Sequence, residues 1–297
     1  IIKKEVITKM NNFRLGLSCC GSQNLDDKDF ENYVKAGILT MEMSFSYTRY
    51  NNLEWKNIEK RAAKFGVELW SLHLPFLPFA QLNPASLKKD VREYTFEYFS
   101  DLIKKAGDIG VKTIVIHPSA EPILDSERGE HIKSAKETFS KLAQVAESSG
   151  NVIAIENIPR TCLCKNSCEM LDILSSDSRL MSCFDTNHLL EENAIDYIRA
   201  VGGRIITTHI SDYDFKNERH WLPGEGKADW KGIISTLREV GYKGPWLYEL
   251  EFEPAQTINR RLLTTEDFRK NYETLMKLEI PEPIGVPISE LCTEWTL

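Results

Sequence analysis

The chain has 297 residues, of which 42% are hydrophobic and 27% are charged, and its formal net charge at pH 7 is −7. This composition is typical of a globular protein and argues against global disorder and against a fibrous architecture. The acidic balance argues against a nucleic-acid partner, because such binding depends on Lys and Arg side chains that neutralise phosphates. The length fits either one α/β barrel of about 250 residues or two ordinary domains.

The cysteine content favours a reducing compartment, and we expect a cytoplasmic protein. Seven cysteines in a chain of this length do not form the even-numbered framework of a short secreted domain. Cys162, Cys164 and Cys168 form a cluster whose spacing does not match zinc-finger pairs, so we interpret them as structural or incidental thiols. No long apolar run occurs, and residues 1–10 lack the apolar core and cleavage site of a leader, so neither a membrane span nor a signal peptide is expected.

Short apolar runs alternate with longer amphipathic segments along the whole chain. From the N-terminus, the pattern predicts strands at residues 13–18, 39–44, 67–74, 111–118, 152–156, 180–185, 204–209 and 246–251. Helices are predicted from the Asp26-Asp27 cap onward and at residues 53–65, 87–109, 127–149, 168–174, 191–201, 230–240 and 265–278. Gly66 ends the second of these helices, and Asp229 caps the helix that opens at Trp230.

Eight strand-then-helix units without a shift in composition predict a single-domain (β/α)8 TIM barrel of the α/β class. We expect residues 1–279 to form the barrel, and the proline-rich tail, residues 280–297, to pack on the barrel or on a neighbouring subunit. A doubly wound open sheet is the alternative architecture. The first strand is not followed by a G-x-G-x-x-G motif, which weakens the dinucleotide-binding version of that alternative.

The segment from Thr207 to Trp230 holds the densest group of ionisable residues. A strand ending in His209 leads into a loop that carries Asp212, Asp214, Glu218, Arg219 and His220. The loop then closes in a turn-forming cluster, residues 223–226, before the next helix begins. A strand, a polar loop and a capped helix in this order are typical of a βα unit whose loop carries chemistry.

Ionisable residues recur at the carboxyl ends of six predicted strands, namely His73, His117, Glu156, Asp185, His209 and Glu249. In a barrel these ends meet on one face, where desolvation is costly unless a metal or a hydrogen-bond network engages the side chains. Taken singly, His73 or His117 is more often a structural residue, and Asp185 could be a helix N-cap. Glu249 and Glu251 alternate onto the same face, so spacing alone leaves the choice between them open.

These segments resemble the xylose isomerase-like barrels, which include sugar epimerases and isomerases, inosose dehydratases and type-four apurinic endonucleases. The resemblance rests on residues 155–159, 184–188, 208–212, 219–226 and 248–249, together with the strands of His73 and His117. It implies that one divalent cation is bound by Glu156, Asp185, His209 and Glu249, with Glu251 behind them. Three carboxylates and one imidazole suit Mn²⁺ best, with Mg²⁺, Co²⁺ and Zn²⁺ as alternatives.

The resemblance also implies the chemistry and the partner. Glu156 and Glu249 would act as base and acid in a sugar isomerase or epimerase that works through an enediolate. The substrate would be a small sugar or polyol, and a homo-oligomer is left open. Expected substrate-binding residues are His73, His117, His188, Arg219 and His220, with Trp70 or Trp221 covering the apolar face of the sugar.

Three other functions are open to this sequence. A lyase that dehydrates a keto-inositol, or eliminates from an oxidised glycoside, would use the same enolisation. An apurinic endonuclease has a three-metal cluster, whose ligand positions are matched by His73, His117, Glu156, Asp185, His188, His209, His220 and Glu249. Its ninth position is an aspartate, where this chain has Glu218, and the acidic charge balance also counts against it. A non-catalytic barrel would be expected to lack one of the paired glutamates, and both are present.

Overall fold

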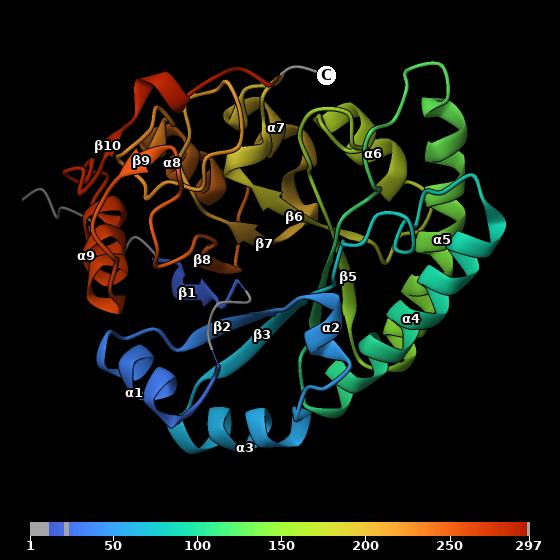
Figure 1. Ribbon diagram of the computed structural model, residues 1–297, viewed down its shortest axis with the longest axis horizontal. Helices are drawn as coiled ribbons and strands as arrows, with labels where there is room; N and C mark the ends of the chain where they lie inside the picture. Colours follow the sequence, from blue (N-terminus) through green and yellow to red (C-terminus); the bar gives the residue numbers. More distant parts are fainter. Residues whose placement is uncertain (1–11, 21–23, 296–297) are drawn as a thin grey trace, which may run out of the picture.

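A computed structural model describes residues 12–20 and 24–295, and eight parallel strands in it form a nearly closed barrel (Figure 1). The strands are β1 Arg14–Ser18, β2 Thr40–Ser44, β3 Glu68–His73, β4 Thr113–Ile116, β5 Val152–Glu156, β6 Met181–Asp185, β7 Ile205–His209 and β8 Pro245–Tyr248. They are hydrogen-bonded in the order β7-β6-β5-β4-β3-β2-β1-β8. A parallel bridge between Ile210 and Tyr248 joins the two ends of this order. The predicted (β/α)8 barrel is confirmed, and the open doubly wound sheet is excluded.

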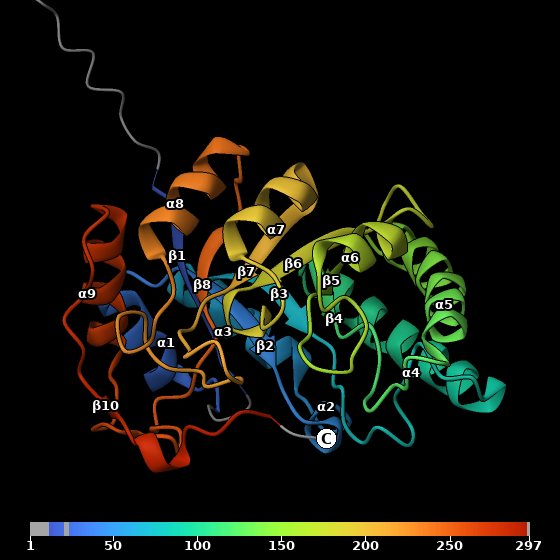
Figure 2. The same ribbon diagram turned by 90° about the horizontal axis from the view of Figure 1, so that it is seen from above.

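Helices surround the barrel on its outside (Figure 2). They are α1 Asp27–Lys35, α2 Tyr47–Tyr50, α3 Trp55–Phe65, α4 Lys89–Asp108, α5 Arg128–Ser148, α6 Ser167–Leu174, α7 Ala194–Val201, α8 Trp230–Glu239 and α9 Thr265–Met276. Three short 3₁₀ segments are η1 Thr186–His188, η2 Gly202–Arg204 and η3 Ser289–Leu291. The predicted caps are present: Asp26 forms a capping box, Gly66 has a left-handed φ of 69°, and Asp229 accepts from the Gly232 N–H.

The predicted strands at residues 111–118 and 246–251 extend beyond the carboxyl ends of the observed β4 and β8, and this changes the positions of two ionisable residues. His117 follows the end of β4, and Glu249 follows the end of β8. Strand β8 pairs with β1 only from Pro245 to Tyr248, and after the bridge with Ile210 the chain leaves the ladder. Glu249 is therefore not on a regular strand with Glu251, which is exposed.

The apolar core lies mainly between the barrel and its helices. Ile153 and Ile155 on β5 belong to this large cluster, as do Ile114 and Ile116 on β4. The inside of the barrel contains a much smaller apolar cluster, formed by Val115, Ala154 and Cys183. Strand alternation therefore places the polar inward-facing residues in the remaining interior, which is the part that carries the candidate chemistry.

The C-terminal tail packs on the barrel of its own chain. Strand β10 (Val286–Pro287) pairs antiparallel with β9 (Ile258–Asn259), and both short strands follow β8. The Gly285 N–H donates to Glu225 Oε1 at 2.8 Å, which joins the tail to the loop between β7 and α8. In Figure 2, β10 lies in the lower part of the view, toward which α2 also lies. A domain boundary at residue 279 stays a prediction.

All seven cysteines lie in the described part of the chain, and no disulfide joins them. Cys162 and Cys164 are buried whereas Cys168 is exposed, so the three thiols do not share one environment. Burial raises the pKa of Cys162 to about 12 and also raises the pKa of Cys164. In the described part of the chain, no helix combines the length and the apolar character needed to cross a membrane.

Candidate metal and active site

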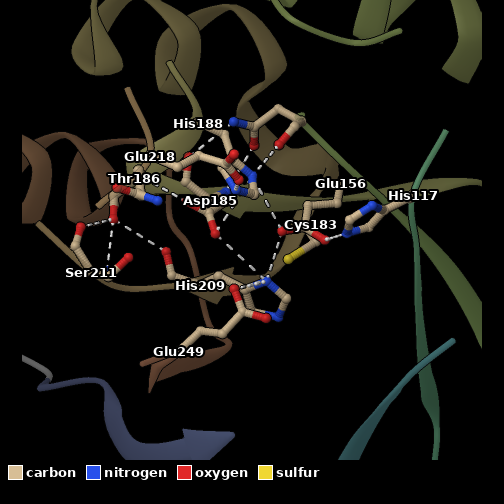
Figure 3. A network of polar contacts seen from close by, with 12 residues as sticks. His117, Glu156, Cys183, Asp185, Thr186, His188, His209, Ser211, Glu218 and Glu249 are labelled. Atoms are coloured by element: carbon tan, nitrogen blue, oxygen red, sulfur yellow. Dashed lines mark hydrogen bonds and ion pairs between the residues drawn. The ribbon is translucent and has the colours of Figure 1, made fainter. Parts of the chain in front are cut away.

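The four predicted metal ligands lie close together at the carboxyl ends of β5 to β8. Glu156, Asp185 and His209 are the last residues of their strands, and Glu249 directly follows β8. Each residue offers one ligand atom, and these four atoms all lie within 4.8 Å of one another. His209 Nδ1 is 2.9 Å from Glu156 Oε1 and 3.1 Å from Glu249 Oε2. Figure 3 shows the four side chains pointing toward one another from different strands.

Asp185 provides a direct test of whether these residues fit a cation. Its Oδ1 accepts from the Asn187 N–H at 2.5 Å, whereas its Oδ2 is buried and has no hydrogen-bond partner in the structure. Oδ2 lies 3.9 Å from His209 Nδ1. Burial raises the pKa of Asp185 well above its usual value, so the ionised form is disfavoured here without compensation. A divalent cation would supply the missing partner, and three carboxylates with one imidazole fit such an ion.

Both candidate catalytic glutamates are held in the ionised form. Burial alone would raise the pKa of Glu156, but the imidazoles of His209, His117 and His73 outweigh it and hold the pKa well below its usual range. Burial likewise opposes ionisation of Glu249, but His209 lowers the pKa of this carboxyl to about 2. Both groups can therefore bind a cation or accept a proton at neutral pH.

The predicted site histidines His73 and His117 lie against Glu156. His73 Nε2 is 3.1 Å and His117 Nε2 is 3.4 Å from Glu156 Oε2. Burial lowers the pKa of both imidazoles; for His73 the nearby carboxylate Glu156 more than offsets this and brings the pKa to about 9, whereas the pKa of His117 stays below its usual value. His73 therefore contributes to the low pKa of Glu156 as a cation in the metal-free protein.

A second group of possible ligands contains His188, Glu218 and His220, whose ligand atoms also lie within 4.8 Å of one another. His188 Nε2 is 2.8 Å from Glu218 Oε1, an ion-pair distance without the alignment of a hydrogen bond. The other oxygen of Glu218 forms an ion pair with Arg160, which also bonds to Glu121 at 2.7 Å. Glu218 is thus shared between an imidazole and a guanidinium.

One cavity of about 390 Å³ at the carboxyl ends of the strands is lined by Glu156 and Glu249 of the first group and by all three residues of the second group. A larger hollow of about 490 Å³ lies beside the amino ends of β5 and β6, and its described lining contains no histidine. The smaller cavity is the candidate active site because it holds the perturbed ionisable residues and lies on the functional face of a barrel. Of the predicted substrate-binding residues, it is lined by His73, His117, His188, Arg219 and His220.

The two predicted aromatic covers lie elsewhere, and both expectations are corrected. Trp70 donates from Nε1 to Thr207 Oγ1 at 3.1 Å, inside the amino-terminal part of the barrel, and the Arg14 guanidinium lies 4.7 Å from its ring centre. Trp221 is only 2% exposed and donates from Nε1 to Thr257 Oγ1 at 3.0 Å. Sequence spacing does not tell which side of a loop or which end of a strand a ring will face.

Arg219 lines the cavity, but its charge is largely engaged by other groups. Its Nε donates to Asp214 Oδ2 at 3.0 Å, and one terminal nitrogen donates to the Thr293 carbonyl of the C-terminal tail at 2.6 Å. The residue is only 6% exposed. The guanidinium therefore joins the loop to the tail, and its expected contact with substrate oxygens stays a prediction.

Two residues at the site were not predicted. Phe76 is 40% exposed in the loop after β3, and its ring stacks on His117 with a centroid distance of 4.4 Å and an interplanar angle of 7°. Glu42 is fully buried on β2, with Oε2 at 3.1 Å from His209 Nε2. The sequence signal for Glu42 was present, because a carboxylate between Met41 and Met43 on an apolar strand needs a compensating partner.

A family model described as the xylose isomerase-like TIM barrel matches residues 30–273. The chain belongs to this family. Its curated relatives include an uncharacterised protein, MJ1311, of Methanocaldococcus jannaschii, which is 30% identical over 56% of this chain and 60% of its own length. This chain thus spans less than two thirds of that relative.

Other similar proteins differ in the activity that their names state. The probable endonuclease 4 of Thermoplasma acidophilum is 24% identical over 72% of this chain and 82% of its own. The inosose isomerase of Bacillus velezensis is 29% identical over 62% of this chain and 71% of its own. The crystal structure of a D-tagatose 3-epimerase-like protein superposes with a TM-score of 0.76 at 22% identity, over 89% of this chain and 97% of the other. This structural likeness supports the fold alone.

Proposed function

We propose that this family member is a divalent-metal-dependent isomerase or epimerase of a small sugar or polyol. The observation that carries the proposal is the convergence of Glu156, Asp185, His209 and Glu249, with a buried Asp185 oxygen that has no hydrogen-bond partner. Relatives named inosose isomerase and fructoselysine 3-epimerase support the reaction class. Mn²⁺ is the preferred ion for this mixture of carboxylates and one imidazole, and Mg²⁺, Co²⁺ or Zn²⁺ would fit the same donors.

The two ionised glutamates would move the proton. When bound, the cation would polarise the substrate carbonyl and make the neighbouring C–H more acidic. Glu156 and Glu249 reach the cavity from β5 and from the end of β8, so they can face a substrate from two directions. One carboxylate removes the proton to leave an enediolate. The other, after it has taken up a proton from solvent, delivers that proton to the opposite face, which inverts the carbon. Return to the adjacent carbon would give isomerisation instead.

The charges around the cavity favour an uncharged substrate over a phosphorylated one. Glu218, Glu251 and Glu253 line it in addition to Glu156 and Glu249. Arg219 is the only Lys or Arg among the described lining residues, and Asp214 offsets its charge. A phosphate would therefore enter a cavity rich in carboxylates in which no Lys or Arg side chain is free to bind it. The exposed ring of Phe76 is available to pack against the apolar face of a sugar.

Two related activities share parts of this site. A lyase would use the same proton abstraction and then expel a β-substituent. The endonuclease-type phosphodiesterase is favoured by one observation, the grouping of His188, Glu218 and His220 as possible ligands of a further metal. The ion pair of Glu218 with Arg160 opposes it, because the guanidinium already neutralises the carboxylate that the further metal would need.

The test combines metal analysis with proton exchange. Purified protein would be stripped with chelator, reloaded with Mn²⁺ and incubated in D₂O with a panel of free ketoses and inososes. We expect one tightly bound ion per chain, and deuterium at the inverted carbon as detected by NMR. Glu156→Gln and Glu249→Gln should each lower the exchange by at least about 100-fold, the lower end for a general acid or base. Glu251→Gln is the matched control for these two variants, because it makes the same substitution at the rim of the cavity.

Four results would overturn the proposal. Absence of divalent-metal binding would remove the proposed site, and full activity of Glu156→Gln on an identified substrate would remove the proposed base. Three ions per chain, together with incision of an abasic-site oligonucleotide at moderate salt, would establish the phosphodiesterase instead. A product lighter than the substrate by one water would identify the lyase.

A further inference from the structure

Glu42 is a charged residue in the interior of the barrel that the proposed reaction does not use. It is fully buried on β2, and it is not among the residues that line the cavity. Its Oε2 accepts from Ser71 Oγ at 2.7 Å and lies 3.1 Å from His209 Nε2. Its Oε1 is buried and has no hydrogen-bond partner in the structure. A buried carboxylate with this few contacts is costly, and a structural role alone does not explain its presence.

The strand register brings the three residues together. The pairing of β2 with β3 shifts between Met41 and Glu42, so that Met41 faces Leu69 and Glu42 faces Ser71. The shift leaves Trp70 as the extra residue of a β-bulge, and it puts the Ser71 hydroxyl beside the Glu42 carboxylate. His209 comes from β7, which is separated from β2 in the sheet by β8 and β1. The contact between Glu42 and His209 therefore crosses the interior of the barrel.

The two nitrogens of His209 face different partners. Nε2 faces Glu42, whereas Nδ1 faces the carboxylates of Glu156 and Glu249. A neutral imidazole carries one proton, and only the nitrogen without it can bind a metal. With the proton on Nδ1, the ring would donate to Glu156 over 2.9 Å and would compete with a cation for this carboxylate. With the proton on Nε2, Nδ1 presents its lone pair among the proposed ligands.

We infer that Glu42, oriented by Ser71, is a positioning residue that selects the His209 tautomer with the proton on Nε2 and so prepares Nδ1 to bind the metal. This rests on the proposed function, because it assumes that His209 is a ligand. The physical basis is general: the acceptor behind a ligating histidine fixes its tautomer and its ring orientation, and its loss typically costs about 10–100-fold in metal affinity. Ser71 donates to the same carboxylate oxygen and so restricts its position.

The experiment compares Glu42→Gln with Glu42→Leu in the full-length protein. Glutamine keeps an oxygen that can accept from both His209 and Ser71, whereas leucine has a similar size and no acceptor. Mn²⁺ and Zn²⁺ dissociation constants would be measured by competition with a chromogenic chelator. The Zn²⁺-loaded proteins would be studied by ¹⁵N NMR of the histidine side chains. Unfolding in chelator would show whether each variant is folded before metal is added.

We expect Glu42→Leu to weaken metal binding by about 10–100-fold and Glu42→Gln to stay within a few-fold of the wild type. The wild-type and Glu42→Gln spectra should show a hydrogen-bonded Nε2–H on His209, and in the leucine variant this proton should lose the downfield shift of a hydrogen bond. Should Glu42→Leu fail to fold, Ser71→Ala gives the second test, with an affinity loss of several-fold and with Nε2 of His209 still protonated.

The outcomes separate this inference from the proposed function. If the wild type binds no divalent metal, both are wrong. If the wild type binds metal and the folded leucine variant binds it within twofold, only the role of Glu42 is wrong. Equal weakening by glutamine and leucine would also contradict it, because the carboxylate charge and not the accepting oxygen would then be the cause.

Discussion

Replacement of Asp185 by asparagine should stabilise the metal-free protein while it removes the response to metal. Oδ2 of Asp185 is buried without a hydrogen-bond partner, and burial raises the pKa of this carboxyl. An asparagine would keep the acceptor for the Asn187 N–H, which Oδ1 provides at 2.5 Å. Its amide would place a donor where Glu156 and Glu249 offer carboxylate oxygens within 4.8 Å.

The magnitude follows from the cost of a buried polar atom without a partner, which is about 1–3 kcal/mol. Unfolding in urea with excess chelator at pH 7 should therefore show a free energy of unfolding higher by about 1–3 kcal/mol for Asp185→Asn. At Mn²⁺ 100 times above its dissociation constant, the wild type should gain about 2.7 kcal/mol. The variant should gain little at the same concentration, because it has lost an anionic ligand.

Asp212 is a matched control, because it is also fully buried but all its acceptor positions are used. It accepts from the N–H groups of Tyr213, Ala228 and Gly224 and from Trp230 Nε1, at 2.8–3.1 Å. In Asp212→Asn the amide group would point at hydrogen-bond donors, and the free energy of unfolding should fall by at least about 1.5–3 kcal/mol. If Asp185→Asn instead destabilises the metal-free protein as Asp212→Asn does, Asp185 is a structural residue and the reasoning is refuted.

Further predictions concern the loops, the last helix and the rim of the cavity. Glu225→Ala should lower the free energy of unfolding by about 3–5 kcal/mol, because it leaves the buried Arg260 without its carboxylate partner at 2.9 Å. A smaller loss than that caused by Arg260→Leu would contradict this. Bonding to Arg261 lowers the pKa of Asp267 to about 2, below its usual value, so this carboxylate stabilises the fold above about pH 4 and loses that effect as the pH falls toward 2. Unfolding of Asp267→Asn should depend less on pH in that window, and an unchanged pH profile would count against it. Glu251→Gln with Glu253→Gln should lower KM for a phosphorylated sugar more than for its free form, and equal changes would argue against electrostatic exclusion.

The ligand group could be predicted from the sequence because it is built on strand ends. Glu156, Asp185 and His209 each follow an apolar run, and in a parallel barrel the ends of such runs must meet. The period of the pattern and the number of units predicted that ionisable residues meet at the strand ends, and the resemblance to the family selected Glu156, Asp185, His209 and Glu249 among them. Glu42 is also a carboxylate within an apolar strand, but it lies in the middle of that strand. A search restricted to strand ends therefore does not find it.

The aromatic residues could not be placed in this way. Trp70 sits at a β-bulge, and a register shift of one residue decides which face a strand side chain occupies. Trp221 lies in the loop after β7, where the bridge between Asp212 and Trp221 and the bond to Thr257 turn its ring away from the cavity. Both positions depend on contacts with segments far along the chain, which local pattern does not encode.

This difference between strands and loops has a consequence for specificity. The proposed metal ligands are fixed by buried strand ends, so their geometry depends on the barrel core, whereas Phe76, Glu251 and Glu253 lie exposed on loops at the same cavity. Loop residues can change without loss of core packing, and ligands at strand ends cannot. Substitutions at the rim should therefore change substrate choice while metal affinity stays constant. Substitution of Glu42 should change metal affinity while substrate choice stays constant.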